Sequence, residues 1–440
     1  MAQLSLAGRA RRLLARNLWI RPAIASLFSI AMAAGAYFFG RSYDGRFDLD
    51  IDEPALVSLF TIFASSMLTV ATFTVSAIVT AASSASNSTT PRASRLVLGD
   101  SKAQIVLSAF IAAFIYSIIS ILALKVLQYG NAGRFVLFAG LLAIVAFVLV
   151  SFVNWVDHAM KLGRQDTTIE RLSEAALNLM RPEHVGTWGA VAYDGAAPAA
   201  ALGIAAPSVG YVSELDLEQL QDIAEALGGA VYLTVRPGDF VDARQPFAYL
   251  TPVSDAARER EADVCATIDV SAAREFDTDV RFGLVNLAET ADRALSPGIN
   301  DPGTAIAILG RQLEVITRWA DVVADEACGE VRHDRVYMPP LAADEIVRDC
   351  FTPIARDGAG AVEVGIRLQK TLAAVVRLNR PDMTRAALEM SQTALALAEA
   401  ALVAEPHKAR VRKAAAEVRR LADAPDEAEQ DLTAAAGVSF

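Results

Sequence analysis

Cysteine and histidine are scarce in this sequence. The 440 residues include three cysteines, Cys265, Cys328 and Cys350, and no two of them form a CxxC pair. The four histidines are scattered and lack the spacing of a metal-ligand set. A disulfide framework and a zinc site both need such groupings, so the sequence argues against a disulfide-stapled secreted domain and against a zinc protein. We expect no metal and no cofactor.

Charge is sparse as well. Charged residues make up 21% of the chain, hydrophobic residues make up 53%, and the mean hydropathy is +0.34. A water-soluble chain needs more polar surface, so part of this chain is predicted to lie in lipid. Residues 1–164 hold 14 Lys and Arg against 7 Asp and Glu (net +7), and residues 165–440 hold 26 against 44 (net −18). This asymmetry predicts a membrane domain followed by an acidic soluble domain, which is a poor nucleic-acid binder.

Four runs without a charged residue predict membrane-spanning helices. They cover residues 22–40, 54–91, 103–124 and 135–156. About 20 apolar residues cross the hydrocarbon core, and each run reaches or nearly reaches that length. Lys and Arg gather before the first run, after the second and after the fourth. Because cytoplasmic segments carry this excess, we expect a multi-pass inner-membrane protein with both termini in the cytoplasm.

The second run contains a periodic row of small polar residues, here called the hydroxyl stripe. At 100° per residue its members fall within an arc of about 100° on a helix. The stripe consists of Ser58, Thr61, Ser65, Thr69, Thr72, Ser76, Thr80, Ser83 and Asn87.

The stripe has two interpretations, and the sequence leaves both open. Small residues allow close packing of membrane helices, and a ring of hydroxyl-bearing helices from several subunits also lines a water-filled path. Arg92 and Arg95 follow the stripe; lipid headgroups are their first expected partners and a pore mouth is the second. No ionisable residue lies near the middle of any run, which argues against a proton-coupled pump.

The second half of the chain predicts a mixed α and β domain. Residues 165–182 have helical spacing, and residues 185–212 suit short strands and loops. Ser213 is the predicted cap of a helix over 214–227, which Gly228 and Gly229 end. Residues 230–250 predict a small β-unit in which Pro237 and Gly238 form the turn of a hairpin.

Helices dominate the rest. A helix before residue 295 is followed by a second helix with Asp301 as its cap and Pro302 at its first position, and residues beyond 341 are nearly all helical. The predicted fold class is a mainly α integral membrane protein: four transmembrane helices, then a cytoplasmic α+β domain with a small β-unit and a helical C-terminal part. The predicted divisions are a basic N-terminal segment (1–17), the four-helix transmembrane domain (18–160), a helical stalk (161–184), the cytoplasmic α+β domain (185–338), a C-terminal helical region (339–424) and an acidic tail (425–440).

Four segments carry a resemblance to a known family. They are GYVSELD from residue 210, RPGDFV from residue 236, REFDTDVRFG from residue 274 and ALSPGINDP from residue 294. With the four apolar runs and the SS…PR residues at the end of the second run (Ser83, Ser84, Pro91 and Arg92), they resemble a bacterial membrane-protein family called domain-of-unknown-function family 2254. The resemblance implies an architecture over nearly the whole chain and a bacterial inner-membrane location, and it implies no activity.

Polar residues gather in and around the last two segments. A turn fixed between two packed helices is the structural interpretation; a polar network at a subunit junction, or one that holds a small ligand, is the functional one. The residues are Arg274, Asp279, Asp292, Arg293, Asn300 and Asp301. The sequence has no GxSxG, P-loop or HExxH motif, so we assign no catalytic residue and do not expect an enzyme.

The leading functional hypothesis is a homo-oligomeric, channel-like conduit in the lipid bilayer, lined by the second helix and controlled by the cytoplasmic domain. It would pass an ion or a small molecule. The alternative is a membrane-anchored sensor or scaffold without transport, and a membrane enzyme is the third hypothesis.

Overall fold

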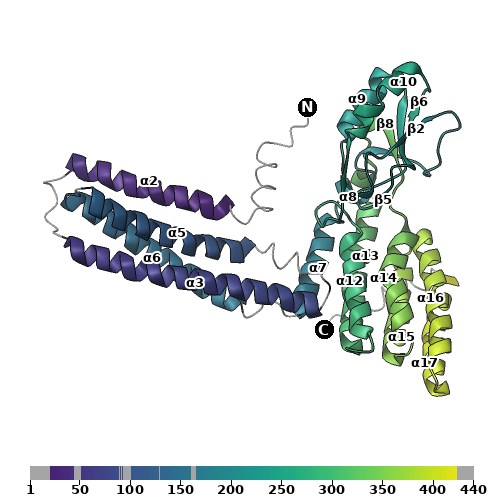
Figure 1. Cartoon of the computed structure of the whole chain (residues 1–440). Helices are drawn as coiled ribbons and strands as arrows, with labels where there is room; N and C mark the ends of the chain where they lie inside the picture. The colour runs from purple at the N-terminus through teal and green to yellow at the C-terminus, as the bar shows by residue number, and fades with distance from the viewer. Residues whose placement is uncertain are drawn as a thin grey trace. The chain divides into compact units, whose positions relative to one another are not determined.

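The computed structural model describes residues 20–43, 51–88, 90, 92, 101–127, 129–159 and 165–423. Two compact units divide the chain, an N-terminal unit from Met1–Thr168 and a C-terminal unit from Ile169–Phe440. Long helices make up the N-terminal unit, whereas the C-terminal unit combines strands with helices (Figure 1). The predicted segments 1–17 and 425–440 lie outside the described residues.

Four helices form the described part of the N-terminal unit. They are α2 (Ile20–Tyr43), α3 (Glu53–Ser88), α5 (Ser101–Val126) and α6 (Asn131–Ala159). Helix α5 packs against the other three, and α2 also packs against α6. Three of the four are long and apolar enough to cross a membrane, and the apolar part of α2 is shorter, Ser26–Gly40. The second, third and fourth predicted spans are therefore confirmed as candidates, whereas the first is a helix with a shorter apolar segment.

One end of this bundle is held by close backbone contact and by an ion pair. A Cβ on Gly40 of α2 would lie 2.8 Å from the Cα of Gly133 in α6, so the two helices touch through their backbones. Small residues permit such contact between membrane helices. Nearby, Arg134 donates to the Glu53 carboxylate over 3.0 Å and thereby ties α6 to the start of α3.

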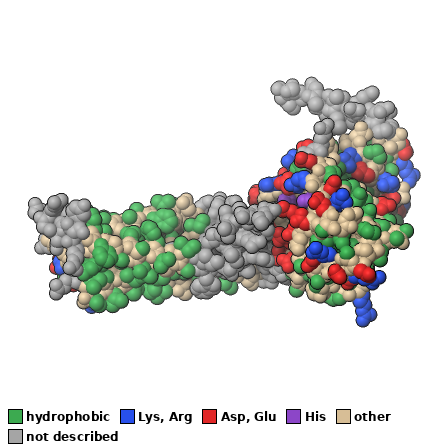
Figure 2. All heavy atoms as spheres, turned by 90° about the horizontal axis from the view of Figure 1, so that it is seen from above, with side chains coloured by type: hydrophobic (Ala, Val, Ile, Leu, Met, Phe, Trp, Pro, Cys, Tyr) green, Lys and Arg blue, Asp and Glu red, His purple; other side chains and the backbone are tan. Residues whose placement is uncertain are grey.

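The surface of the N-terminal unit is apolar. Large hydrophobic side chains are exposed on all four helices, for example Phe28, Phe73, Leu122 and Val153. Figure 2 shows hydrophobic side chains covering these helices, whereas charged side chains of both signs cover the C-terminal unit. Apolar exposure on this scale is typical of a surface that faces lipid.

The C-terminal unit contains two sheets. The five-stranded sheet has the order β1-β8-β4-β6-β2, and the three-stranded sheet has the order β5-β3-β7. Strand β8 pairs in parallel with β1 and β4, and all other pairs are antiparallel. The strands are β1 (Ala190–Ala192), β2 (Leu202–Ala205), β3 (Gly210–Leu215), β4 (Ala230–Leu233), β5 (Phe240–Val241), β6 (Pro246–Thr251), β7 (Ile268–Ser271) and β8 (His333–Met338).

Helices make up the remainder of this unit. A hydrophobic core lies among α12 to α17, where Trp319, Phe351 and Leu372 are buried. Helix α12 packs on α13 and α14, and α15 packs on α13, α16 and α17. The helices are α7 (Gln165–Leu179), α8 (Pro182–Val185), α9 (Leu217–Ala226), α10 (Asp255–Glu259), α11 (Glu261–Cys265), α12 (Phe282–Leu295), α13 (Pro302–Ala324), α14 (Ala343–Asp357), α15 (Val362–Val376), α16 (Pro381–Ala401) and α17 (Glu405–Asp423).

Two local predictions in the β-region are wrong. Ser213 lies inside β3 at a register shift, and the cap of α9 is Asp216, whose carboxylate accepts from the backbone N–H of Gln219. The turn at Pro237 and Gly238 is present, but its flanking strands do not pair as a hairpin: β4 pairs with β6 and β8, and β5 pairs with β3 in the other sheet. Non-local pairing overrides the local pattern here.

Candidate functional site

The hydroxyl stripe lies on the outward side of α3. Helix α3 packs on α5 through a buried row made of Leu56, Phe60, Ala64, Met67, Ala71 and Thr74. At 100° per residue this row centres about 180° from the stripe. Eight members of the stripe are exposed: Ser58, Thr61, Ser65, Thr69, Thr72, Ser76, Thr80 and Ser83. The ninth, Asn87, belongs to α3, but its side chain lies outside the described residues.

Four hydroxyl groups in the described part of the stripe bond to the backbone of their own helix. Thr61 donates to the carbonyl of Val57 over 2.8 Å, and Thr69 donates to the carbonyl of Ser65 over 2.9 Å. Ser65 and Thr72 make equivalent bonds over 2.9 Å to carbonyls three and four residues earlier. Each donor hydrogen is thereby satisfied, while the oxygen keeps lone pairs that can accept from another partner.

The outward face of α3 is mixed rather than purely polar. Ile62, Phe73 and Val79 are exposed beside the stripe. Of the two arginines predicted at a pore mouth, Arg92 is exposed in a turn, and Arg95 lies outside the described residues. Within the described part of the chain, the stripe therefore lies on the side of α3 opposite the buried row, and its side chains are exposed.

In the C-terminal unit, the partly buried Arg274 forms an ion pair with the buried Asp279 just before α12. The Arg274 guanidinium donates to both carboxylate oxygens of Asp279, over 2.5 and 3.0 Å. The backbone N–H groups of Arg281 and Phe282 donate to the same carboxylate over 3.0 and 3.1 Å. Burial raises the pKa of Asp279, and the hydrogen bonds and charges of Arg274 and Arg281 act in the opposite direction. The pair fixes the start of α12.

A turn brings the RPGDFV segment onto this carboxylate. Asp239 donates its N–H to the carbonyl of Arg236 over 3.0 Å, which closes a β-turn with Pro237 and Gly238 at its centre. Gly238 has φ +95°, and a Cβ there would lie 2.3 Å from the Cγ of Asp279. Two segments that are about 40 residues apart in the sequence thus touch through a glycine that no larger residue can replace.

Arg281 is the centre of a wider charge cluster. It donates to Asp349 over 2.7 Å and to Glu345 over 3.2 Å, and Arg236 donates to Glu345 over 2.6 Å. Burial acts to raise the pKa of Glu345, but the charges and hydrogen bonds of Arg236 and Arg281 hold it below its usual value. Glu345 and Asp349 could not be predicted from the sequence, because two acids on a later helix carry no local sign of distant arginine partners.

A small cavity adjoins this cluster. Its volume is about 20 Å³, and its walls come from α8, the Arg236 turn, residues 278–281 and Leu341. Three buried polar atoms around it lack a hydrogen-bond partner within the described structure: His184 Nδ1, Arg236 Nη1 and Thr278 Oγ1. Burial lowers the pKa of His184. A polar space of this size has room for about one water molecule and is too small for a larger ligand.

The other polar residues of the predicted network lie at the far end of α12. Asp292 pairs with Arg356 over 2.9 Å, and Asp301 caps α13 by accepting from the N–H of Thr304 over 3.1 Å. Asn300 has φ +50° in the turn between the helices, and Arg293 lies in the last turn of α12. Helix α12 has 14 residues, which corresponds to about 21 Å. The six residues therefore form two separate groups and not one network within the chain.

The described residues contain neither a cluster of metal-ligating side chains nor a disulfide. In the described part of the chain, no three His, Cys, Asp or Glu residues gather as a metal site would require. Cys265, Cys328 and Cys350 are free cysteines. Burial raises the pKa of all three thiols, which keeps them in the unreactive protonated form.

Long apolar helices together with an apolar exposed surface define an integral membrane protein. The chain belongs to the family described as "Predicted membrane protein (DUF2254)", which matches residues 15–374 and confirms the resemblance of the four segments. It is 27% identical over 364 residues to the uncharacterized protein Rv1290c of Mycobacterium tuberculosis and equally to the uncharacterized protein Mb1321c of Mycobacterium bovis. Each alignment covers 78% of this chain and 68% of the relative. No solved structure matches the chain.

Proposed function

We propose that the protein assembles as a homo-oligomer in which α3 of each subunit lines a conduit across the membrane and the C-terminal unit controls it. The observation that carries the proposal is the outward position of the hydroxyl stripe. The chain's own helices leave this polar face exposed, so its hydroxyl groups need other hydrogen-bond partners. Copies of α3 arranged around a common axis would enclose water, and the hydroxyl groups would contact that water and the neighbouring copies of α3.

The length of the stripe supports a conduit over a simple contact. From Ser58 to Ser83 the stripe extends about 38 Å along the helix, which exceeds the hydrocarbon thickness of about 30 Å. Two helices that cross at an angle meet over a few turns only. Polar residues along the whole span are therefore more than a crossing contact requires.

The chemistry of the stripe fits a neutral, hydrated lining. Residues 54–91 contain no Asp, Glu, Lys, Arg or His. Hydroxyl oxygens whose own hydrogens are bonded to the backbone still accept hydrogen bonds from water and coordinate cations. In lipid those lone pairs have no donor, so a lipid-facing stripe leaves them unsatisfied.

Cysteine accessibility tests the proposal. In a background with Cys265, Cys328 and Cys350 replaced by alanine, Thr69→Cys, Thr72→Cys and Ser76→Cys are treated with a membrane-impermeant thiol reagent. We expect the stripe positions to react at least tenfold faster than Val75→Cys, because a thiol ionises and reacts in water and not in lipid. Val75 is the matched control, since it is exposed on the same helix but lies off the stripe.

Equal rates at the stripe and at Val75 would show that the stripe is dry. If reconstituted vesicles then also pass no ions, the spans serve as an anchor. The protein would in that case be a membrane-anchored sensor or scaffold.

A further inference from the structure

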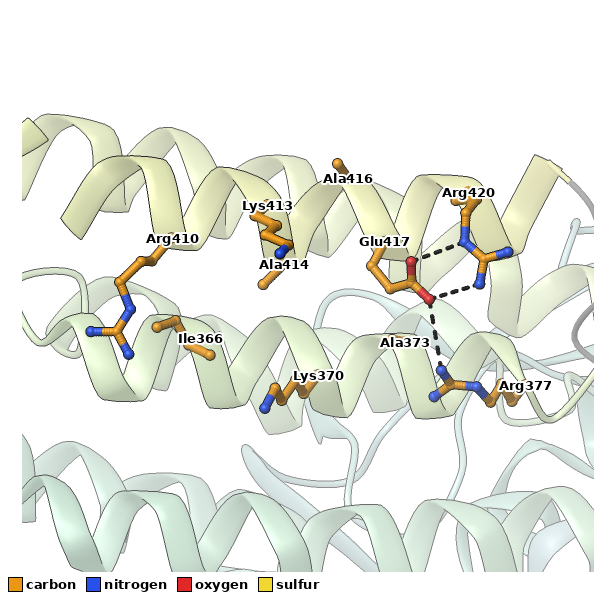
Figure 3. A pocket seen from close by; sticks show the side chains of 10 residues that line it. All are labelled: Ile366, Lys370, Ala373, Arg377, Arg410, Lys413, Ala414, Ala416, Glu417 and Arg420. Atoms are coloured by element: carbon orange, nitrogen blue, oxygen red, sulfur yellow. Dashed lines mark hydrogen bonds and ion pairs between the residues drawn. The ribbon is translucent and has the colours of Figure 1, made fainter. Parts of the chain in front are cut away.

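Helices α15 and α17 form a groove with an unusual charge. They run side by side in the same direction, and the groove between them has a volume of about 1020 Å³ (Figure 3). Close packing at one end brings α17 against Gly365, where a Cβ would lie 3.4 Å from Val411. Small residues leave the space open beyond that point, since Ala373, Ala414 and Ala416 line the groove.

Five cations and one carboxylate line this groove. Glu417 is held by Arg420 over 2.9 Å and by Arg377 over 4.0 Å. The hydrogen bond from Arg420 lowers the pKa of Glu417, so the carboxylate is ionised at neutral pH. The other cations are Lys370, Arg410 and Lys413, and among the described residues none of these three forms an ion pair with a carboxylate. An excess of positive charge therefore remains at the Arg410 end.

The positive charge of the groove contrasts with the net negative charge of the rest of the C-terminal unit. Residues 165–440 carry a net charge of −18, yet one groove gathers five cations from α15, its C-terminal cap residue Arg377 and α17. Arg410, Lys413, Glu417 and Arg420 are spaced by three, four and three residues, which places them on one side of α17 over about 15 Å. Exposed cations at this density attract a multiply charged anion and repel one another without it.

We propose that this groove binds a soluble anion of nucleotide size that carries two or more phosphate groups. Arg and Lys are the usual partners of phosphate, and cations spread over about 15 Å exceed what a single phosphate can contact. The volume suits a ligand of that size. The proposal goes beyond the conduit function and does not depend on it.

Two other partners fit the groove less well. Membrane-surface helices insert large apolar side chains beside their cations, whereas the large apolar residues of α17, Val411, Val418 and Leu421, are all buried. A long nucleic acid meets the net negative charge of the whole unit, which repels it. A soluble phosphate compound meets neither obstacle.

Calorimetric titration of the full-length protein tests the site. The protein is held in nanodiscs of phosphatidylcholine, and inorganic tripolyphosphate is the probe, with orthophosphate as the comparison. We expect saturable tripolyphosphate binding that is at least tenfold tighter than orthophosphate binding and that weakens as salt screens the exposed cations. Lys413→Gln and Arg410→Gln should each weaken it about tenfold, the usual loss for one charge-assisted hydrogen bond.

Arg419→Gln is the matched control. Arg419 is exposed on the same helix, but it lines the neighbouring groove against α16, so its loss should leave the affinity unchanged. Thermal melts of all variants show whether the fold is intact. The proposal fails if tripolyphosphate does not bind at low salt, if orthophosphate binds equally well, or if Arg419→Gln and Lys413→Gln weaken binding equally. It also fails if phosphatidylglycerol vesicles bind the groove and displace tripolyphosphate, because the ligand is then a lipid headgroup.

Discussion

At the scale of single residues, the C-terminal unit depends on contacts between segments that are distant in the sequence. The Asp279 carboxylate accepts from Arg274 and from two backbone N–H groups, and the Gly238 turn closes over it. Arg281 then links this point to Glu345 on α14. The structural roles of Gly238, Asp279 and Arg281 therefore depend on residues far away in the sequence and cannot be inferred from their immediate neighbours.

Replacement of Gly238 by alanine should destabilise this unit strongly. The new Cβ would clash with Asp279, and φ +95° disfavours any residue with a side chain. We expect the free energy of unfolding of the C-terminal unit to fall by about 3 kcal/mol. Urea unfolding measures the change. Gly298→Ala is the control and should cost little, since a Cβ there meets nothing within 4 Å.

Replacement of Glu345 by glutamine should lower stability in a pH-dependent way. The change leaves Arg236 and Arg281 without part of their compensating charge, for a loss of about 2 kcal/mol at pH 7. The folded protein holds the pKa of Glu345 below its ordinary value of 4.5, so the stabilisation is present above that pH and is lost as the pH falls through the folded value.

The difference between wild type and Glu345→Gln should therefore shrink as the pH is lowered below 4.5. Unfolding at a series of pH values measures it. Asp344→Asn is the control on the same helix, because its ion pair with Arg348 is exposed and surface pairs contribute little. A difference that stays constant down to pH 3 would contradict the proposed role of the carboxylate charge.

At the scale of elements, helix caps show where local signals are sufficient and where they are not. Asp301 and Pro302 open α13 as the sequence predicts, because the cap needs only the backbone N–H groups of its own first turn. Ser213 has equally good cap chemistry, yet it lies in β3 and the cap falls to Asp216. Pairing of β3 with β7 extends the strand past the serine and delays the helix.

The caps can be compared directly by mutation. We expect Asp301→Ala and Asp216→Ala each to lower the free energy of unfolding by about 1 kcal/mol, because each leaves a helical N–H without its acceptor. Asp301→Asn keeps an acceptor oxygen and should cost less. Ser213→Ala should lower the free energy of unfolding less than Asp216→Ala does. An equal or larger loss would indicate that Ser213, and not Asp216, caps α9. Chemical unfolding followed by circular dichroism measures all four.

At the scale of the whole molecule, the chain joins an apolar unit to an acidic one. The apolar part of α2, Ser26–Gly40, is shorter than the three candidate spans in the described part of the chain. Its 15 residues correspond to about 22 Å, which is less than the hydrocarbon thickness. Whether both ends of the protein lie on one side of the membrane depends on this helix.

Reporter fusions decide the orientation. We expect a fluorescent protein to be active at either terminus, and alkaline phosphatase to be active only when it is inserted after Gly45 or Gly130. Four spans with basic segments in the cytoplasm produce this pattern. Active phosphatase at the N-terminus, with an inactive fusion at the C-terminus, would mean that α2 does not cross the membrane.

The sequence by itself determined the features that depend on composition and on short-range period. These are the apolar helices, the stripe on α3, the Asp301 cap and the family hallmark, because a helix is specified by neighbours three and four residues apart. Only the tertiary structure decided which strands pair, that β8 enters the sheet beside β4, and that the six polar residues divide between the two ends of α12.

The tertiary structure alone also placed α15 beside α17, and so gathered five cations from a strongly acidic half of the chain into one groove. Such pairings depend on contacts between residues that are far apart along the chain. Many alternative partners of similar hydrophobicity compete for each strand or helix face, and only the packing of the complete core selects among them.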